Sequence, residues 1–180
     1  MLKVKEMQKL KLSSKIRIAV HPQKPVRFSE KRLRFYAKYA DVVFKTLKKP
    51  LFQKFLNWVI KRENIEENMV KDVQVKVFPL LKENGNALAG RWSSRGKILI
   101  YPKRLGFFRK LMRNCKKEKV YFYIKSRAMA TLIHELLHIK YLDDEDKVRE
   151  LTKRYFGIFI QHQNIQNLNT NNILKVLFPN

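Results

Sequence analysis

The sequence predicts an α+β domain, because helical and strand patterns both recur along the chain. Apolar residues repeat every three or four positions over 30–47, as on one face of a helix, and the helix expected at 126–141 is apolar almost all round, as in a buried helix. Over 73–77 they alternate with polar residues, as in a strand. With 180 residues, of which 45% are hydrophobic and only 5 are Gly and 6 Pro, the chain is neither collagen-like nor disordered.

The N-terminal third is expected to contain one strand and two helices. Residues 10–20 alternate weakly and fit a strand. Ser29 is placed to cap the helical pattern that runs from Glu30 to Leu47. Pro50 then favours the immediate start of a second helix, because proline is well tolerated in a first helical turn.

The remainder of the chain is expected to add a small sheet and three helices. Val73, Val75 and Val77 alternate as in a strand, and Asn84-Gly85 indicates a turn. The further expected elements are strands at 86–92 and 97–101, and helices at about 107–112, 126–141 and 144–162, with Ser126 as the cap of the middle helix.

These elements are expected to form a single domain over residues 1–180. Its parts are a basic N-terminal helical part (1–70), a core (about 73–162) and a polar tail (163–180). No apolar run approaches the roughly 18–20 residues of a membrane span, and the N-terminus lacks the apolar stretch of a signal peptide. The single Cys115 excludes an intramolecular disulfide and a cysteine zinc site, so a reducing, cytoplasmic location is the expectation.

The charge balance is strongly basic. The chain has 40 Lys+Arg against 15 Asp+Glu, a formal net charge of +25, which suits polyanions such as nucleic acid. Cations and aromatic residues interleave in three segments, 31–36, 104–110 and 119–125, as in proteins that bind phosphates and stack on bases. No sequence-specific recognition motif is present, so any nucleic-acid binding is expected to be nonspecific, and the helical spacing of the aromatics equally fits burial.

One pair of histidines, His134 and His138, lies in an otherwise apolar helical segment. Histidines four residues apart project from the same helical face, where both imidazoles can bind one Zn²⁺. Glu135 is rotated to lie beside such a metal, where it can take a proton from a zinc-bound water and deliver it to a leaving amine. Without a partner, these buried polar groups would be costly. We therefore expect zinc at His134 and His138, with Glu135 as the general base.

A catalytic zinc site also needs a third protein ligand. Six of the 15 acidic residues fall within 135–150, and five of them follow His138. Glu145 is the leading candidate, because it would lie in the first turn of the next helix and can face back toward the histidines. The alternatives are Asp144, Glu150 and His162, and the remaining acids fit the ordinary charge of a helix N-terminus.

Around this motif the sequence resembles the SprT-like and minimal gluzincin metallopeptidases. The resemblance is carried by Gly90-Arg91-Trp92, by the run from Gly96 to Pro102, and by Thr131-Leu132-Ile133-His134-Glu135-Leu136-Leu137-His138. It implies a zincin-like fold, in which a small, mostly antiparallel sheet packs on a backing helix and a zinc-bearing helix. The chain lacks a histidine shortly downstream of His138, which favours a glutamate-type site through Glu145.

The function expected from these features is zinc-dependent hydrolysis of peptide bonds in a peptide or protein substrate. The segment 86–89 would form the rim of the cleft, and Arg149, Tyr155 or His162 could stabilise the oxyanion, although Arg149 could equally pair with Glu145. The enzyme would be latent if Leu174–Phe178 or the N-terminal segment covered the cleft. The alternative is a basic nucleic-acid-binding protein whose metal site is structural or idle.

Overall fold

The structure, a computed structural model, describes residues 17–21, 28–82, 84–93 and 95–162. Within these ranges the chain forms an open four-stranded sheet and five α-helices, so the predicted α+β class is confirmed. The elements in chain order are β1 (Arg17–His21), α2 (Glu30–Leu47), α3 (Pro50–Arg62), a 3₁₀ turn η1 (Glu67–Met69), β2 (Asp72–Lys76), β3 (Gly90–Ser93), β4 (Lys97–Ile100), α4 (Leu105–Asn114), α5 (Lys117–Tyr141) and α6 (Glu145–His162).

The sheet is mixed, with strand order β1-β2-β4-β3, and the expected mostly antiparallel arrangement is wrong. β2 pairs in parallel with both β1 and β4, and only the edge strand β3 runs antiparallel to its neighbour. The parallel pairs arise because α2 and α3 separate β1 from β2, and β3 separates β2 from β4. Each of these intervening segments carries the chain back to the end of the sheet at which the earlier strand of the pair began.

Two expected strands differ in their bounds from those observed. The strand expected at 86–92 begins only at Gly90, and before it Ala87 forms a single isolated bridge with Leu81. The strand expected at 10–20 is observed at 17–21, and its earlier positions lie outside the described residues. Gly85 has a φ of 77°, in agreement with the predicted turn.

The helix α2 has the predicted bounds and α3 starts at Pro50 as predicted, whereas α5 starts nine residues earlier than expected. Ser29 occupies the N-cap position of α2 without a side-chain capping bond. Ser126 is not a cap: it lies fully buried inside α5, which begins at Lys117. The predicted helix continues toward its N-terminus because Val120 and Ile124 extend the buried face.

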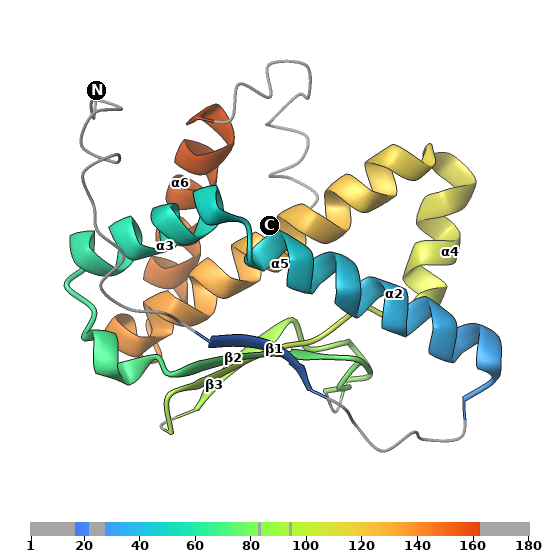
Figure 1. The fold of residues 1–180 in the computed structure, drawn as a ribbon, viewed down its shortest axis with the longest axis horizontal. Helices are drawn as coiled ribbons and strands as arrows, with labels where there is room; N and C mark the ends of the chain where they lie inside the picture. Colours follow the sequence, from blue (N-terminus) through green and yellow to red (C-terminus); the bar gives the residue numbers. More distant parts are fainter. Residues whose placement is uncertain (1–16, 22–27, 83, 94, 163–180) are drawn as a thin grey trace.

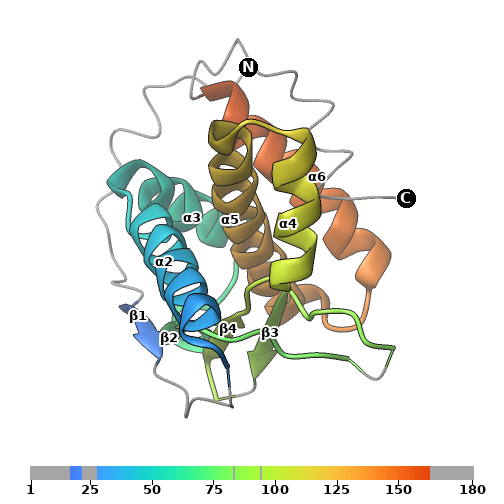
Figure 2. The same cartoon turned by 90° about the vertical axis from the view of Figure 1, so that its right-hand side faces the viewer.

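All five helices lie on one side of the sheet, and α5 is the central one (Figures 1 and 2). It packs against α2 on one flank and α6 on the other, and it also contacts β3 and β4. The expectation of a buried histidine helix with a backing helix is met by α5 and α2. Among the residues described, no helix is both long enough and apolar enough to cross a membrane.

Candidate metal centre

The central helix presents one continuous stripe of side chains to an open cleft. The cleft has a volume of about 1230 Å³ and lies between α5, the edge strand β3 with the segment before it, and the start of α6. The lining residues of α5 recur at the spacing of a single helical face: Tyr123, Arg127, Ala130, Thr131, His134, Glu135 and His138. His134, Glu135 and His138 therefore all border the cleft from one face of α5.

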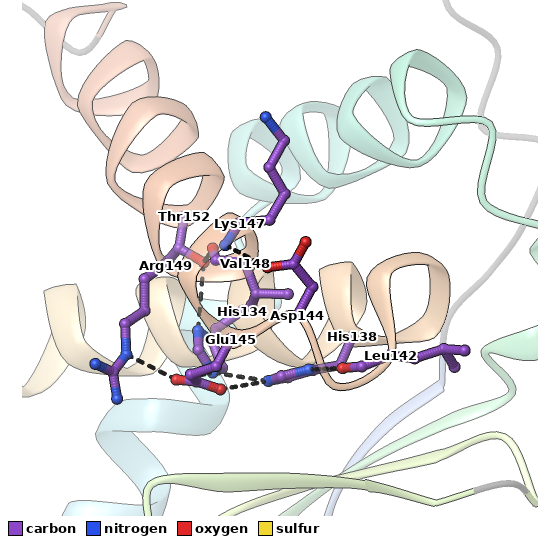
Figure 3. Close-up of polar contacts among 9 residues, drawn as sticks. All are labelled: His134, His138, Leu142, Asp144, Glu145, Lys147, Val148, Arg149 and Thr152. Carbon is purple, nitrogen blue, oxygen red and sulfur yellow. Dashed lines mark hydrogen bonds and ion pairs between the residues drawn. The ribbon is translucent and has the colours of Figure 1, made fainter.

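His134, His138 and Glu145 converge at one end of the cleft (Figure 3). The two Nε2 atoms lie 3.0 Å apart; Glu145 Oε2 lies 3.2 Å from His138 Nε2, and Glu145 Oε1 lies 3.7 Å from His134 Nε2. Zinc–nitrogen bonds of about 2.0–2.1 Å at tetrahedral angles would separate two donors by roughly 3.3 Å. The N–N separation of 3.0 Å and the shorter N–O separation of 3.2 Å are close to this value, and one ligand atom of each residue lies within 4.8 Å of the others, so the three side chains could hold a metal ion.

Hydrogen bonds hold both imidazoles in the orientation that directs Nε2 into this triangle. His138 Nδ1 donates to the backbone oxygen of Leu142 at 2.6 Å. Thr152 Oγ1 donates to Val148 O at 2.7 Å and lies 3.5 Å from His134 Nδ1, for which it is placed as an acceptor. With Nδ1 protonated, each Nε2 keeps its lone pair, which is the form that a metal ligand needs.

The turn between α5 and α6 brings Glu145 to the histidines. Leu142 follows the last residue of α5 and has a φ of 48°, which is unusual for a residue with a side chain. The chain reverses within three residues, and Glu145 begins α6 facing back across the turn. The predicted third position thus lies at the histidine pair, and its role as a ligand remains a prediction.

The alternative third ligands have other partners or positions. Asp144 Oδ1 accepts a hydrogen bond from the backbone N–H of Lys147 at 3.0 Å, as an N-cap residue does (Figure 3). Glu150 lies 3.6 Å from Lys147 Nζ. His162 is the last residue of α6 and does not line the cleft. Of the four candidates, only Glu145 joins the histidines in the part of the chain that the structure describes.

Burial shifts the pKa values of His134 and Glu135 in opposite directions. It lowers the pKa of His134 to about 4, against the opposing pull of the Glu145 carboxylate, so this imidazole is neutral at pH 7. It raises the pKa of Glu135 to about 7, although the positive field of His138 and a hydrogen bond from the Trp92 backbone oppose the shift. Glu135 is therefore able both to accept and to release a proton near neutral pH.

The side chain of Glu135 lies tightly against β3. Only 7% of Glu135 is exposed, and its carboxylate accepts from the N–H of Trp92. Tyr101 N–H donates to Ala89 O, so the N–H and C=O groups of Gly90 and Trp92 point to the other edge of β3. The predicted base thus lies at the free edge of the sheet.

The predicted rim and oxyanion donors lie in different environments. Ala87, Leu88 and Ala89 line the cleft, so the segment 86–89 forms its rim without being a strand. Arg149 also lines the cleft, but its Nε donates to Glu145 Oε1 at 2.8 Å, the ion pair that the sequence allowed. Tyr155 is buried and donates to Glu63 on the other side of α6.

A buried carboxylate that sequence analysis did not identify supports the turn after α5. Glu63, at the end of α3, accepts hydrogen bonds from Tyr141 at 2.6 Å, from Lys140 at 3.3 Å and from Tyr155. Burial alone would raise the pKa of Glu63, but these donors outweigh it and lower the pKa. No local pattern marks this residue, since its partners are 77 to 92 positions away in the sequence.

The aromatics of the basic segments are mostly packed into the domain. Tyr36 and Phe108 are buried, and Phe107 packs against Tyr123 with ring centroids 5.2 Å apart. This packing removes much of the surface that bases could stack on. The terminal segments that were expected to cover the cleft, Leu174–Phe178 and the N-terminus, lie outside the described residues.

Comparisons of the chain with protein-family models, with curated proteins and with solved structures found no match.

Proposed function

We propose that the chain is a zinc-dependent metallopeptidase of the zincin type, with His134, His138 and Glu145 as the metal ligands. The observation that carries the proposal is the convergence of one ligand atom each from His134, His138 and Glu145 within 4.8 Å of one another, with the two Nε2 atoms 3.0 Å apart. When both imidazoles are neutral with Nδ1 protonated, their Nε2 lone pairs and the Glu145 carboxylate face one another in a half-buried position, and a bound cation would compensate them.

The second argument for a hydrolytic rather than a structural site is the open face of the triangle. Three protein ligands leave a fourth position, and the donors border a cleft large enough for a peptide. Zinc bound there would lower the pKa of a water molecule and polarise a carbonyl group. Structural zinc sites, by contrast, are usually closed by four protein ligands.

Glu135 is assigned the proton transfers. Its carboxylate adjoins the histidine pair, and burial holds its pKa near neutrality, where a carboxylate can take a proton from water and return it to an amine. The Trp92 N–H fixes the position of the carboxylate. Arg149 holds Glu145 from the opposite side and thereby orients the proposed third ligand.

Metal analysis and peptide cleavage test this proposal together. We expect one zinc ion per chain in the purified protein, its loss in His134→Ala, and its retention in the control His162→Ala. Glu135→Gln is expected to keep the zinc and to abolish cleavage of a peptide mixture, while Glu118→Gln, an exposed change on the same helix, keeps both. Absence of zinc from the wild type, or cleavage that survives Glu135→Gln, would contradict the proposal.

The charge supports a second candidate, nonspecific nucleic-acid binding with an idle metal site. Its basis is the net charge of +25 and the exposed cations along the cleft, among them Lys82, Arg91 and Lys153. A fluorescent single-stranded oligonucleotide should then bind at low salt and dissociate steeply as salt is raised. Binding of this kind without any peptide cleavage would favour the second candidate over the first.

A further inference from the structure

We propose that the end of the cleft away from the histidines binds a carboxylate of the substrate, about three residues from the bond that is cut. The subsite is formed by Arg127 on α5 and Lys103, which lies between β4 and α4. This inference rests on the proposed peptidase function and adds the class of peptide that the enzyme prefers.

Arg127 is a buried cation whose hydrogen bonds are incomplete. Only 5% of the residue is exposed, although it lines the cleft. Nη1 donates to Tyr101 O at 2.7 Å and lies 3.3 Å from Tyr39 OH, but Nη2 has no hydrogen-bond partner within the described part of the chain. Neither Nη1 partner carries a full negative charge, so the guanidinium lacks a counterion in this region.

Lys103 places a second cation beside Arg127. The pKa of Lys103 is lowered, first by its burial and then by the positive charge of Arg127. Its ammonium lies 5.2 Å from the centre of the Phe107 ring, and no described carboxylate pairs with it. Two neighbouring, partly desolvated cations without an acid among the described residues are the environment in which an anion binds best.

The two ends of the cleft differ in charge: the end at the histidines carries both acids and cations, among them Arg149 and Lys153 on α6, whereas the end at Arg127 carries cations. The acidic lining residues are Glu135, Asp143, Glu145, Asp146 and Glu150, all at or beyond the histidine pair. Near the N-terminal half of α5 the lining is cationic and aromatic, with Lys103, Phe107, Tyr123 and Arg127. A negative group bound at the Arg127 end therefore meets cations without a neighbouring acid of the cleft lining, whereas at the histidine end it would also meet the carboxylates.

The distance between the two ends gives the position of that group in a peptide. Arg127 and His134 are seven residues apart on one face of α5, which corresponds to about 10 Å along the helix. An extended peptide advances about 3.3 Å per residue, so a bond at the histidines places the third residue beside the two cations. The carboxylate can belong to an Asp or Glu side chain, or to the C-terminus of a short peptide.

Cleavage of a peptide library distinguishes these two sources. The library is prepared with free and with amidated C-termini, and the cut positions are determined by mass spectrometry. We expect Asp and Glu to be enriched two to four positions from the cut, or cuts to cluster two to four positions from a free C-terminus and to vanish after amidation. Lys103→Gln should remove the preference, and Lys110→Gln, an exposed change on α4 outside the cleft, should keep it.

A binding measurement keeps the inference testable when no peptide is cut. A labelled peptide with Glu at the preferred position and its Gln counterpart are titrated into zinc-free Glu135→Gln protein. If the library yields no preferred position because no peptide is cut, the two peptides differ at their C-terminal residue, which is Glu in one and Gln in the other. The acidic peptide should bind about tenfold more tightly, as expected for a charge-assisted hydrogen bond, and Lys103→Gln should abolish the difference. The buried Arg127→Met serves as a second variant after its folding has been checked.

The outcomes separate the two proposals. If acidic peptides are preferred but zinc and cleavage are absent, the proposal of a peptidase is wrong, and the carboxylate subsite remains as a binding site. If peptides are cut without any acidic preference, or if Lys103→Gln leaves the preference unchanged, the subsite is wrong. A single-stranded oligonucleotide that displaces the acidic peptide and depends on Lys103 more strongly than the peptide does would also overturn it.

Discussion

Gly90 on β3 lies so close to Glu135 on α5 that a Cβ atom at Gly90 would fall 2.6 Å from Glu135 Oε1. The same atom would lie 2.7 Å from Glu135 Cγ and from Thr131 Cγ2. Real Cβ contacts are longer, so the strand and the helix can approach this closely only through a glycine. The backbone of β3 therefore forms one wall of the pocket that holds the proposed general base.

Replacement of Gly90 by alanine should harm both stability and the site. The added methyl group must displace Glu135 or push β3 away from α5, which typically costs about 1–3 kcal/mol. Urea unfolding should show this loss, and peptide cleavage should fall with it. Gly157→Ala is the control, since a Cβ there meets nothing within 4 Å and a helical glycine gains stability from this change. Equal stabilities of Gly90→Ala and the wild type would contradict the packing argument.

Replacement of Glu145 should mainly lower zinc affinity, whereas replacement of Asp144 should mainly lower the stability of the fold. Glu145→Ala removes a proposed ligand, so zinc affinity should fall by more than the roughly 10–100-fold typical of an outer hydrogen-bond partner. Asp144→Ala removes the cap of α6 and should cost about 1 kcal/mol of stability while zinc affinity changes little. Competition with a chelator measures the affinities. A larger loss of affinity in Asp144→Ala would reverse the assignment of the third ligand.

Most helices could be predicted because their signals are local. Ser29 and the apolar spacing after it predict the observed bounds of α2, and Pro50 predicts the observed start of α3. The start of α5 was missed because its first turn is polar and basic, and Ser126 offered a more familiar cap. The sheet order could not be predicted, since pairing of β2 with β1 and β4 depends on contacts between segments far apart in the sequence.

The residues of the candidate site also fall into those that local sequence patterns predict and those that depend on distant contacts. The spacing of His134 and His138 within one helix is local, and so is the short turn that brings Glu145 back. Glu63, Arg127 and Gly90 derive their roles from partners on other elements. The sequence indicates the chemistry, whereas the packing around it follows from tertiary contacts.

Removal of the Glu135 charge should stabilise the metal-free protein above pH 7. The folded pKa of Glu135 is raised from 4.5 to about 7, so its contribution to stability is full below pH 4.5 and is lost as the pH rises to 7. In the presence of a chelator, Glu135→Gln should not lose stability between pH 4.5 and 7 in this way. Its free energy of unfolding should exceed that of the wild type by about 1–3 kcal/mol at pH 8. Urea unfolding at several pH values measures the difference. A variant that is less stable at pH 8 would contradict the burial argument.

His134 should show the opposite dependence on pH. Its folded pKa is lowered from 6.5 to about 4, so its contribution is full above pH 6.5 and is lost as the pH falls toward 4. In the wild type this loss partly offsets the gain from Glu135 over the same range. His134→Gln in the metal-free protein should therefore keep more of its stability between pH 6.5 and 4 than the wild type does. Parallel curves for the two proteins would rule out a buried neutral imidazole.

Loss of the Glu63 carboxylate should loosen the end of α5 and weaken the zinc site from a distance. Glu63 accepts from Tyr141, which directly precedes Leu142, and the Leu142 oxygen holds His138. Glu63→Gln leaves Tyr141, Lys140 and Tyr155 without their charged acceptor and should cost about 2–4 kcal/mol.

The pH dependence of the free energy of unfolding distinguishes the role of Glu63 as a charged hydrogen-bond acceptor from a role in packing alone. The folded pKa of Glu63 is lowered, so its stabilisation is present above pH 4.5 and is lost as the pH falls through the folded pKa. Glu63→Gln should therefore lose less stability on acidification than the wild type does. Tyr155→Phe, which removes one donor and leaves the turn beside Leu142 intact, should cost about 1 kcal/mol and preserve zinc affinity. Equal zinc affinities of Glu63→Gln and the wild type would show that the buried carboxylate stabilises the fold without positioning His138.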